Sequence, residues 1–347
     1  MKILKVIDTL EIGGAEKVFI DLTNLLHEKG VDVSALFILQ PGKWANQLHA
    51  NIKQQTLNRK FKWSLPTLYR CARFINQYDI IHCHHRYVFA YINLCAMLFG
   101  VRAKIILHDH YGLIDLNQQV PKNIAGIFKP THFIGVSKKL TDWAKDILKV
   151  NAKQVYLLAN IVRSIKQPID ADKIYDWVLV SNIKPVKNQL FAVALAQQMN
   201  KSLLIVGNIQ DAKYYQALQD AIANGGARIT IQTHISDVRP LLAQAKMGLH
   251  VSTSETGPLA LIEYLSMGLP FVAYQTGEVA QTVKSVFPEM VVPTFDITQW
   301  EAAVKLVESS IAPSYQQAIE NFYKANFSEE QYVSQCLSIY RNILADS

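Results

Sequence analysis

Two glutamates stand eight residues apart in the stretch "STSETGPLALIEYLSMGLPFVAY", which runs from Ser252 to Tyr274. Gly257 and Pro258 lie between Glu255 and Glu263, and proline suits the first position of a helix. We expect the start of that helix to offer free backbone N–H groups to an anion. One carboxylate can then reach a sugar hydroxyl while the other holds a ribose diol. The segment therefore predicts a site for a ligand that carries both phosphate and hydroxyl groups.

Histidines crowd the ends of two expected strands, and five of the ten lie within 29 residues: His82, His84, His85, His108 and His110. Such histidines serve as catalytic or substrate-binding groups, as metal ligands or as parts of the core. A metal site would take Asp109 as a further ligand. The binuclear hydrolase pattern H-x-H-x-D-H is not met, because Arg86 and Tyr87 occupy the following positions. We expect no metal and keep a metal-dependent hydrolase as an alternative.

Glycines and lysines follow other expected strands. Gly13 and Gly14 precede the first helix, where N–H groups with no Cβ in the way favour a phosphate; a tight turn is the alternative. The G-x-G-x-x-G fingerprint is absent and no acidic residue closes the second strand, so a nicotinamide cofactor is not expected. Lys184 and Lys187 follow the first strand of the second half. They can neutralise a leaving diphosphate, or they form an ordinary basic turn.

The chain positions these residues by alternating short apolar runs with amphipathic helices, such as the one from Ala15 to His27. The expected strands of the first half are "ILKVID", "VDVSALFIL", "DIIHC", "AKIILH", "THFIGV" and "QVYLL". Those of the second half are "WVLVSN", "SLLIVGN", "RITIQT", "MGLHVS", "LPFVAY" and "MVVPTF". This alternation predicts an α/β protein with two Rossmann-like parallel sheets. Ligands of such sheets bind at the carboxyl ends of the strands.

The polar segment from Asn160 to Asp176 separates the two halves and is the expected linker, and one or two helices are expected from Pro313 to Leu344. Half of the residues are hydrophobic and 18% are charged, which predicts a folded core. The four cysteines form no C-x-x-C pair, which fits a reducing compartment. We expect neither a signal peptide nor a membrane-spanning helix, and therefore a cytoplasmic protein.

The net charge of +7 is unevenly shared between the halves. Residues 1–165 contain 22 Lys and Arg against 11 Asp and Glu, and the remainder contains 13 against 17. Basic and aromatic residues interleave in "NRKFKWSLPTLYRCARF", and the candidates for a membrane or acceptor surface are Arg59, Lys60, Lys62, Trp63, Arg70 and Arg73. Ordinary packing with a solvated basic rim is the alternative. Nucleic acid is not expected, because no recognition motif is present.

The frame S-E-x-G-x-x-x-x-x-E-x-x-x-x-G-x-P-x-V-A around Glu255 resembles the Glu-x7-Glu signature of retaining GT-B glycosyltransferases, the large family 4. The stretches "GGAE", "IGVSKKL", "LLANIV" and "SDVRPLLAQAKMGLHVSTSE" are also similar to parts of that family, so the resemblance covers nearly the whole chain. It implies the GT-B fold, in which two Rossmann-like domains face each other across a cleft. The acceptor domain would be residues 1–165, to which a helix at about 328–347 crosses back, and the donor domain residues 166–327.

The resemblance implies catalytic roles for Glu255, at the donor sugar, and for His108, near the transferred sugar. The donor-binding residues that it implies are Gly13, Gly14, Asn182, Lys184, Lys187, Glu255, Thr256, Gly257, Pro258, Leu259 and Glu263. The chain departs from the family at Asn182, where an arginine is usual, and in reading E-T-G-P for E-G-F-G. Either Lys184 substitutes for the arginine, or the enzyme is slow or depends on a partner.

The activity that the resemblance implies is transfer of a sugar from a UDP- or GDP-linked donor to a glycan or lipid-linked acceptor, with retention of the anomeric configuration. The expected pathway is bacterial cell-surface polysaccharide or lipopolysaccharide biosynthesis, at the cytoplasmic face of an anionic inner membrane. No obligatory cofactor is implied, because lysines and helix N-termini can stabilise the leaving diphosphate. A nucleotide-sugar-binding partner with little activity is a further alternative.

Overall fold

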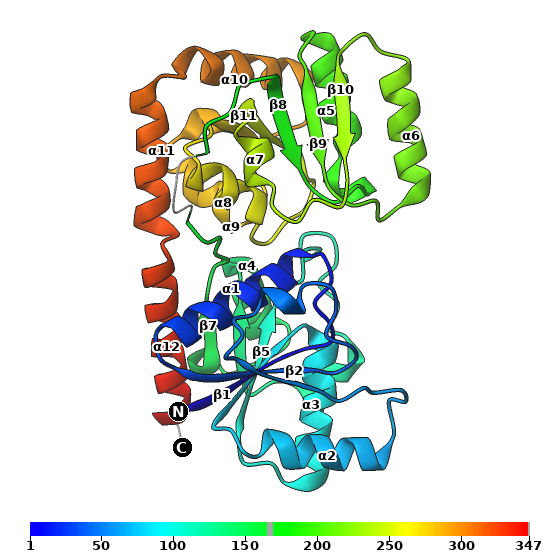
Figure 1. The fold of residues 1–347 in the computed structure, drawn as a ribbon, viewed down its shortest axis with the longest axis vertical. Coiled ribbons are helices and arrows are strands. Elements are labelled where there is room, and N and C mark those ends of the chain that lie inside the picture. The colour runs from blue at the N-terminus through cyan, green and yellow to red at the C-terminus, as the bar shows by residue number, and fades with distance from the viewer. Residues whose placement is uncertain (165–168, 346–347) are drawn as a thin grey trace. The chain divides into compact units, whose positions relative to one another are not determined.

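The structure, a computed structural model, describes residues 1–164 and 169–345, which form two compact units (Figure 1). Unit 1 consists of Met1–Ile161 and the residues from Glu329 on, and unit 2 consists of Val162–Ser328. The expected boundary between residues 165 and 166 lies outside the described residues. The acceptor and donor roles of the two domains stay predictions.

Unit 1 is built on a sheet of seven parallel strands in the order β3-β2-β1-β4-β5-β6-β7. The strands are β1 Lys2–Ile7, β2 Asp32–Phe37, β3 Lys53–Thr56, β4 Ile80–His84, β5 Lys104–Asp109, β6 His132–Gly135 and β7 Val155–Leu157. The helices are α1 Gly14–Glu28, α2 Leu65–Ile75, α3 Arg86–Phe99, α4 Lys138–Asp146 and α12 Glu329–Ala345.

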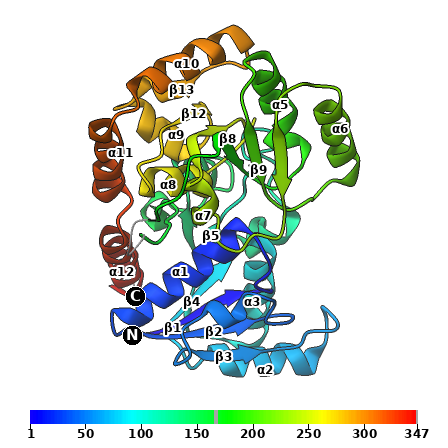
Figure 2. The same ribbon diagram turned by 45° about the horizontal axis from the view of Figure 1, so that its top comes forward.

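Successive residues of each strand face opposite sides of this sheet. On one side Ile3, Ile80 and Ile106 pack with residues of α1 and α12. On the other side Leu4 and Leu107 pack with residues of α2, α3 and α4. Because both faces are covered, most strands appear in the sequence as short, largely apolar runs; the exception is the exposed edge strand β3, which has no apolar residue. The C-terminal helix α12 thus belongs to the core of unit 1, and Figures 1 and 2 both show it beside α1.

Unit 2 is built on a sheet of six parallel strands in the order β10-β9-β8-β11-β12-β13. The strands are β8 Tyr175–Val180, β9 Leu203–Val206, β10 Ile229–Gln232, β11 Ala245–His250, β12 Phe271–Tyr274 and β13 Val291–Val292. The helices are α5 Gln189–Gln198, α6 Ala212–Ala223, α7 Arg239–Leu242, α8 Leu259–Ser266, α9 Gly277–Lys284, α10 Ile297–Ser310 and α11 Pro313–Asn326, with a 3₁₀ turn at Pro185–Lys187. The predicted pair of Rossmann-like parallel sheets is confirmed.

Candidate active site

The residues that the sequence singled out in unit 2 meet at one place on its sheet. Strand β8 lies between β9 and β11, so the chain leaves β8 in one direction and later returns on its other side. The gap between the carboxyl ends of β8 and β11 is therefore a topological switch point, where open α/β sheets bind ligands. The loop after β8 carries Lys187, and the loop after β11 carries Glu255.

Lys187 and Glu255 form an ion pair at this switch point. Both side chains are shielded from solvent, with exposed fractions of 17% for Lys187 and 12% for Glu255. His250 ends strand β11 and places its Nε2 atom 3.4 Å from the Glu255 carboxylate. Burial by itself raises the pKa of Glu255, but Lys187 and His250 outweigh it and hold the pKa well below the ordinary value. The site thus keeps an ionised carboxylate in a largely enclosed position.

Backbone hydrogen bonds tie three loops together around this pair. Thr253 N donates to the Val186 carbonyl at 2.9 Å, which joins the loops after β11 and β8. The loop after β12 is joined through Thr276, whose Oγ1 accepts from Glu255 N at 3.0 Å. His250 and Thr276 were not predicted from the sequence. The sequence signal that bears on them is their position at the carboxyl ends of β11 and β12, neighbours in the sheet, which by itself does not distinguish them from ordinary buried residues.

Helix α8 begins at Leu259, and Pro258 is its N-cap residue with an extended backbone rather than its first helical residue. The helix presents its less buried side through Leu259, Glu263 and Ser266, whereas Ile262 and Leu265 are buried. Leu259 is partly buried and still packs against the core of unit 2. Glu263 lies one turn after Leu259 on that same less buried side.

Asn182, at the position of the expected arginine, forms hydrogen bonds that join neighbouring parts of unit 2. Its Oδ1 accepts from Asn208 N at 3.3 Å, and its carbonyl accepts from Gln189 Nε2 at 2.9 Å. Lys184 directly precedes the 3₁₀ turn that ends at Lys187, and it is half-buried. Burial and the neighbouring Lys187 lower the pKa of Lys184, while Glu255 raises it. Lys187 thus lies close enough to influence the charge of Lys184.

In unit 1 the switch point lies between β1 and β4. Gly13 is the N-cap of α1 and Gly14 is its first residue, whereas the sequence analysis placed both glycines before a helix that starts at Ala15. A Cβ atom at Gly13 would fall on the Glu16 carboxylate, so Glu16 folds back over this glycine. His85 follows β4 with φ +75° and ψ 143°, which is strained for a histidine, and its Nε2 lies 3.8 Å from Glu16 Oε1. In the described conformation the Gly13 turn is next to a carboxylate, and Glu16 must move before an anion can approach.

The other four histidines form a buried array on β4 and at the end of β5. His82 Nε2 lies 2.9 Å from His108 Nδ1, and His84 Nδ1 lies 3.0 Å from His110 Nε2. Ring nitrogens of His82, His84 and His108 approach within 4.8 Å of one another, a spacing that a metal ion could use. Asp109, the further ligand foreseen from the sequence, is held by Arg86 Nε at 2.9 Å.

Lys5 on β1 lies beside this array and was not singled out from the sequence. Its side chain is fully buried, and burial lowers its pKa to about 7. Burial, and then neighbouring charged groups that include Lys5, hold the pKa values of His82, His84, His108 and His110 well below the ordinary value. These histidines are therefore neutral. A lysine inside an apolar strand was a signal in the sequence that something unusual surrounds it.

Comparison with solved structures identifies the fold. The chain is similar to HepE of Anabaena in complex with UDP and glucose, with 16% identity, coverage of 98% of this chain and 99% of that one, and a TM-score of 0.80. A glycosyltransferase from Rickettsia africae is 17% identical, with coverage of 100% of this chain and 99% of that one and a TM-score of 0.78. The lipopolysaccharide outer core galactosyltransferase WaaB is 14% identical, with coverage of 98% of this chain and 99% of that one and a TM-score of 0.69. At these identities the likeness shows the fold alone.

Family models decide the class of enzyme. The model of Glycosyltransferase Family 4 matches residues 12–164, and that of Glycosyl transferases group 1 matches residues 175–309. The chain is a glycosyltransferase of the GT-B fold. Among curated proteins, none matches its sequence. Within residues 1–164 and 169–345 of this glycosyltransferase, no helix has both the length and the apolar character needed to cross a bilayer.

The basic and aromatic segment of the glycosyltransferase lies largely at the surface of unit 1. Phe61 and Trp63 are 74% and 68% exposed, and Lys62 lies over the Trp63 ring at 5.3 Å. Lys60, Arg70 and Arg73 are also exposed. Arg59 differs, because it is partly buried and lies 4.7 Å over the ring of the buried Tyr91. The end of helix α3 adds further exposed apolar side chains, namely Met97, Leu98 and Phe99.

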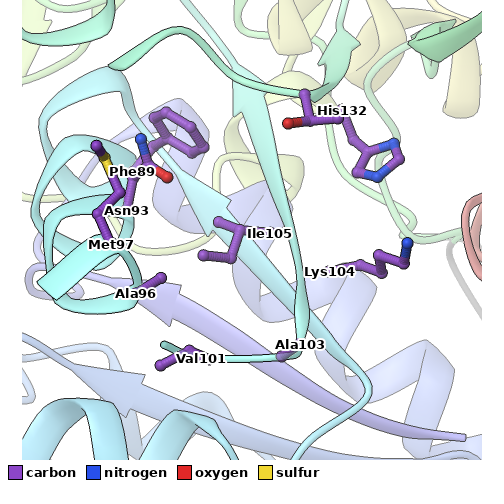
Figure 3. Close-up of a pocket in the computed structure, with 10 residues that line it drawn as sticks. Phe89, Asn93, Ala96, Met97, Val101, Ala103, Lys104, Ile105 and His132 are labelled. Carbon is purple, nitrogen blue, oxygen red and sulfur yellow. The ribbon is translucent and has the colours of Figure 1, made fainter. Parts of the chain in front are cut away.

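A pocket of about 340 Å³ lies beside these residues, between α3 and the amino ends of β5 and β6. Figure 3 shows Phe89, Met97 and Ile105 on the side of β5 that faces α3, while the side chains of Lys104 and His132 point to the other side. The lining on the α3 side is therefore mostly apolar. This pocket lies at the end of the sheet opposite to His84 and His108, so it is separate from the switch point of unit 1.

Proposed function

We propose that this glycosyltransferase transfers a sugar from a UDP- or GDP-linked donor, with retention of configuration, and that unit 2 binds the donor. The observation that carries the proposal is the Lys187–Glu255 ion pair beside His250, at the switch point of the second sheet. A cation and an ionised carboxylate held together there match the diphosphate and the adjoining sugar of a nucleotide sugar. Lysine neutralises a diphosphate, and a carboxylate accepts from sugar hydroxyls.

In this proposal, binding of the donor breaks the ion pair between Lys187 and Glu255. Lys187 turns from Glu255 to the diphosphate, and Glu255 becomes free to accept hydrogen bonds from the donor sugar. The bond between the anomeric carbon and the diphosphate oxygen then breaks, and its electrons leave with the diphosphate. The acceptor hydroxyl forms the new bond and passes its proton to the departing diphosphate oxygen. Lys184 and Lys187, together with the backbone N–H groups at Gly257 to Leu259, stabilise the charge that develops. Glu263 holds the ribose, and His108 contacts the transferred sugar.

We propose a lipid-linked or other cell-surface glycan as the acceptor, in polysaccharide or lipopolysaccharide biosynthesis. The structural neighbour WaaB is named a lipopolysaccharide outer core galactosyltransferase, which is consistent with such a substrate. The surface of unit 1 supports the same proposal. Residues 33–108 contain ten Lys and Arg but only one acidic residue, Asp79. Exposed Phe61, Trp63 and Phe99 accompany this positive charge, a combination that suits the headgroup region of an anionic bilayer.

A nucleotide-sugar-binding protein with little activity is the second candidate. It is favoured by Asn182, because a neutral side chain that is already bonded to Asn208 adds no charge at the diphosphate. Transfer to any acceptor, or hydrolysis of the donor, distinguishes the enzyme from such a binding protein. A metal-dependent hydrolase based on the histidine array would lose activity in excess chelator, whereas we expect the glycosyltransferase to retain it.

The test begins with a thermal-shift screen of UDP- and GDP-sugars, since a ligand at 100 times its dissociation constant adds about 2.7 kcal/mol of stability. With the donor found, we expect Glu255→Ala to abolish transfer while UDP or GDP alone still binds. Glu263→Ala is expected chiefly to weaken donor binding by about 1.5–3 kcal/mol, the usual cost of a charge-assisted hydrogen bond. Near-normal turnover of Glu255→Ala at saturating donor contradicts the assignment.

A further inference from the structure

His108 is linked by hydrogen bonds to the C-terminal helix, far away in the sequence. Its Nδ1 lies 2.9 Å from His82 Nε2, and His82 Nδ1 lies 2.6 Å from the Tyr340 hydroxyl. All three side chains are fully buried. The chain of contacts therefore runs from α12 through β4 to β5, entirely inside unit 1. Of the ring nitrogens of His82 and His108, Nε2 of His108 is the one without a hydrogen-bond partner among the described residues, and this atom is buried.

The order of donors and acceptors along this chain follows from the chemistry of its members. Tyr340 contacts the Cys336 thiol one helical turn earlier, and burial raises the pKa values of both groups, so each keeps its proton. An imidazole nitrogen is a better acceptor than a thiol sulfur. The Tyr340 hydroxyl therefore donates to His82 Nδ1. Because a neutral imidazole carries one proton, that proton is on His82 Nε2, and it is donated to His108 Nδ1.

We propose that Tyr340 and His82 are positioning residues that fix the tautomer of His108, so that its Nε2 carries the proton and donates to an oxygen of the transferred sugar. The inference rests on the proposed function for the role of the sugar, but the tautomer itself is a property of the free protein. In this arrangement His108 acts as a neutral hydrogen-bond donor. The C-terminal helix, which follows unit 2 in the sequence, thereby sets the chemistry of a residue in the first sheet.

The neighbouring histidine pair shows that the link is specific to His108. His84 and His110 are hydrogen-bonded to each other at 3.0 Å, and their rings lie parallel at 5.1 Å. His110 is nevertheless more exposed than His108. Lys5, the other buried nitrogen beside the array, affects the charge state of all four imidazoles, but its Nζ forms no hydrogen bond with them. Of the two pairs, the His82–His108 pair is the one connected to a hydroxyl on α12.

The experiment compares Tyr340→Phe with Tyr332→Phe in the full-length chain. Both tyrosines lie on α12 and both are buried, but the Tyr332 hydroxyl has no hydrogen-bond partner among the described residues. Each change removes one oxygen and keeps the ring, so core packing is matched. The readout is the ¹⁵N spectrum of histidine-labelled protein, which separates protonated from unprotonated ring nitrogens, with His108 assigned by its loss in His108→Gln.

We expect wild type and Tyr332→Phe to show a single His108 tautomer protonated at Nε2, and Tyr340→Phe to show a mixture. Transfer by Tyr340→Phe should be roughly three- to tenfold slower in kcat at unchanged donor KM, the loss expected for one neutral hydrogen bond. Tyr332→Phe should be normal. An unchanged His108 spectrum in Tyr340→Phe, or equal effects of the two variants, overturns the proposal. Normal turnover of His108→Ala instead overturns the proposed role of His108 at the sugar, whatever the spectrum shows.

Discussion

At the scale of single residues, Glu255 is the most informative side chain, because its environment prepares it for charge. It is only 12% exposed yet ionised, since Lys187 pairs with it and His250 lies 3.4 Å away. A buried carboxylate without such partners would take up a proton instead. The same arrangement explains why Lys187 and Glu255, the two residues proposed to bind the donor, form an ion pair: each neutralises the charge of the other.

This pairing predicts a pH-dependent stability. The pKa of Glu255 in the folded protein is depressed, so its contribution is fully present above the ordinary carboxyl pKa of about 4.3 and is lost as the pH falls below it. We expect Glu255→Gln to lower the free energy of unfolding of unit 2 by about 1–3 kcal/mol at pH 7. The difference from wild type should shrink as denaturant titrations are repeated from pH 5 down to pH 3.

The control for this prediction is Glu320→Gln, which removes an exposed ion pair with Lys324 in the same unit. We expect it to change stability by less than about 1 kcal/mol, as is usual for surface pairs. If the difference between wild type and Glu255→Gln is the same at pH 3 and pH 7, the carboxylate is not held in the ionised state by its neighbours.

At the scale of elements, the turn after β8 brings two lysines to the site where the family arginine is missing. We predict that they hold the diphosphate together. Calorimetric titration with UDP or GDP should show that Lys184→Ala with Lys187→Ala loses far more affinity than Lys187→Ala alone. Each charged hydrogen bond lost costs about 1.5–3 kcal/mol, or roughly ten- to hundredfold. A silent Lys184→Ala in both backgrounds means that Lys184 does not replace the arginine.

The turn before α9 supports the Glu255 loop, and Gly277 is the residue that permits the contact. Its φ is +80°, and a Cβ atom there would lie 2.8 Å from Pro258 Cδ and 3.1 Å from Glu255 Cβ. We predict that Gly277→Ala destabilises unit 2 by more than the roughly 1–2 kcal/mol typical of a left-handed residue and also weakens binding of the nucleotide sugar, measured by calorimetry.

Gly30→Ala is the matched control, because Gly30 has a similar φ of +74° with nothing within 4 Å of the added atom. It should carry the backbone cost alone and leave donor binding unchanged. Equal donor affinities for Gly277→Ala and wild type would show that the contact with the Glu255 loop is not needed for binding.

The elements also show which parts of the site a sequence can reveal. Strands buried on both faces are apolar runs, so most of them, and with them the parallel sheets, could be predicted. The edge strand β3 was missed, because its four residues are polar and mostly exposed. Ligands of parallel sheets bind at the carboxyl ends of the strands, and this rule predicted that Lys187 and Glu255 lie at the same edge of the sheet. His250 obeys the same rule, but a single histidine at the end of a strand is also common as an ordinary buried residue, so its position alone does not distinguish it.

The contact between Tyr340 and His82 could not be predicted, because 258 residues separate them. Helical periodicity indicates which side of α12 is buried but not which sheet covers it. The same limitation applies to Arg59, because its stacking on Tyr91 is a tertiary contact that cannot be predicted from a basic segment of sequence. Met97, Leu98 and Phe99 end an apolar helix, a pattern that is typical of a core, yet all three are exposed.

At the scale of the whole molecule, the uneven distribution of charge is the main feature without a role in donor binding. Residues 1–165 carry twice as many basic as acidic residues, and the remainder carries an excess of acidic ones. Exposed apolar side chains accompany the positive charge on α2, on the loop before it and at the end of α3. Each basic residue near an anionic leaflet contributes about 1 kcal/mol, so a few are enough for reversible attachment.

We therefore predict that the protein floats with anionic vesicles at low salt, and that Lys60→Ser with Lys62→Ser and Arg70→Ser reduces this binding at least tenfold. Arg59 is left unchanged, because its replacement would remove both a positive charge and the packing against Tyr91, and the two effects could not be separated. Lys29→Ser with Lys122→Ser and Lys153→Ser is the control, since it removes the same charge from exposed positions elsewhere in unit 1. Binding should fall steeply with added salt, because screening shortens the range of these charges.

If both triple variants lose binding equally, attraction is set by net charge and not by this surface. If wild type does not bind anionic vesicles at low salt, the basic residues of unit 1 do not form a membrane-binding surface.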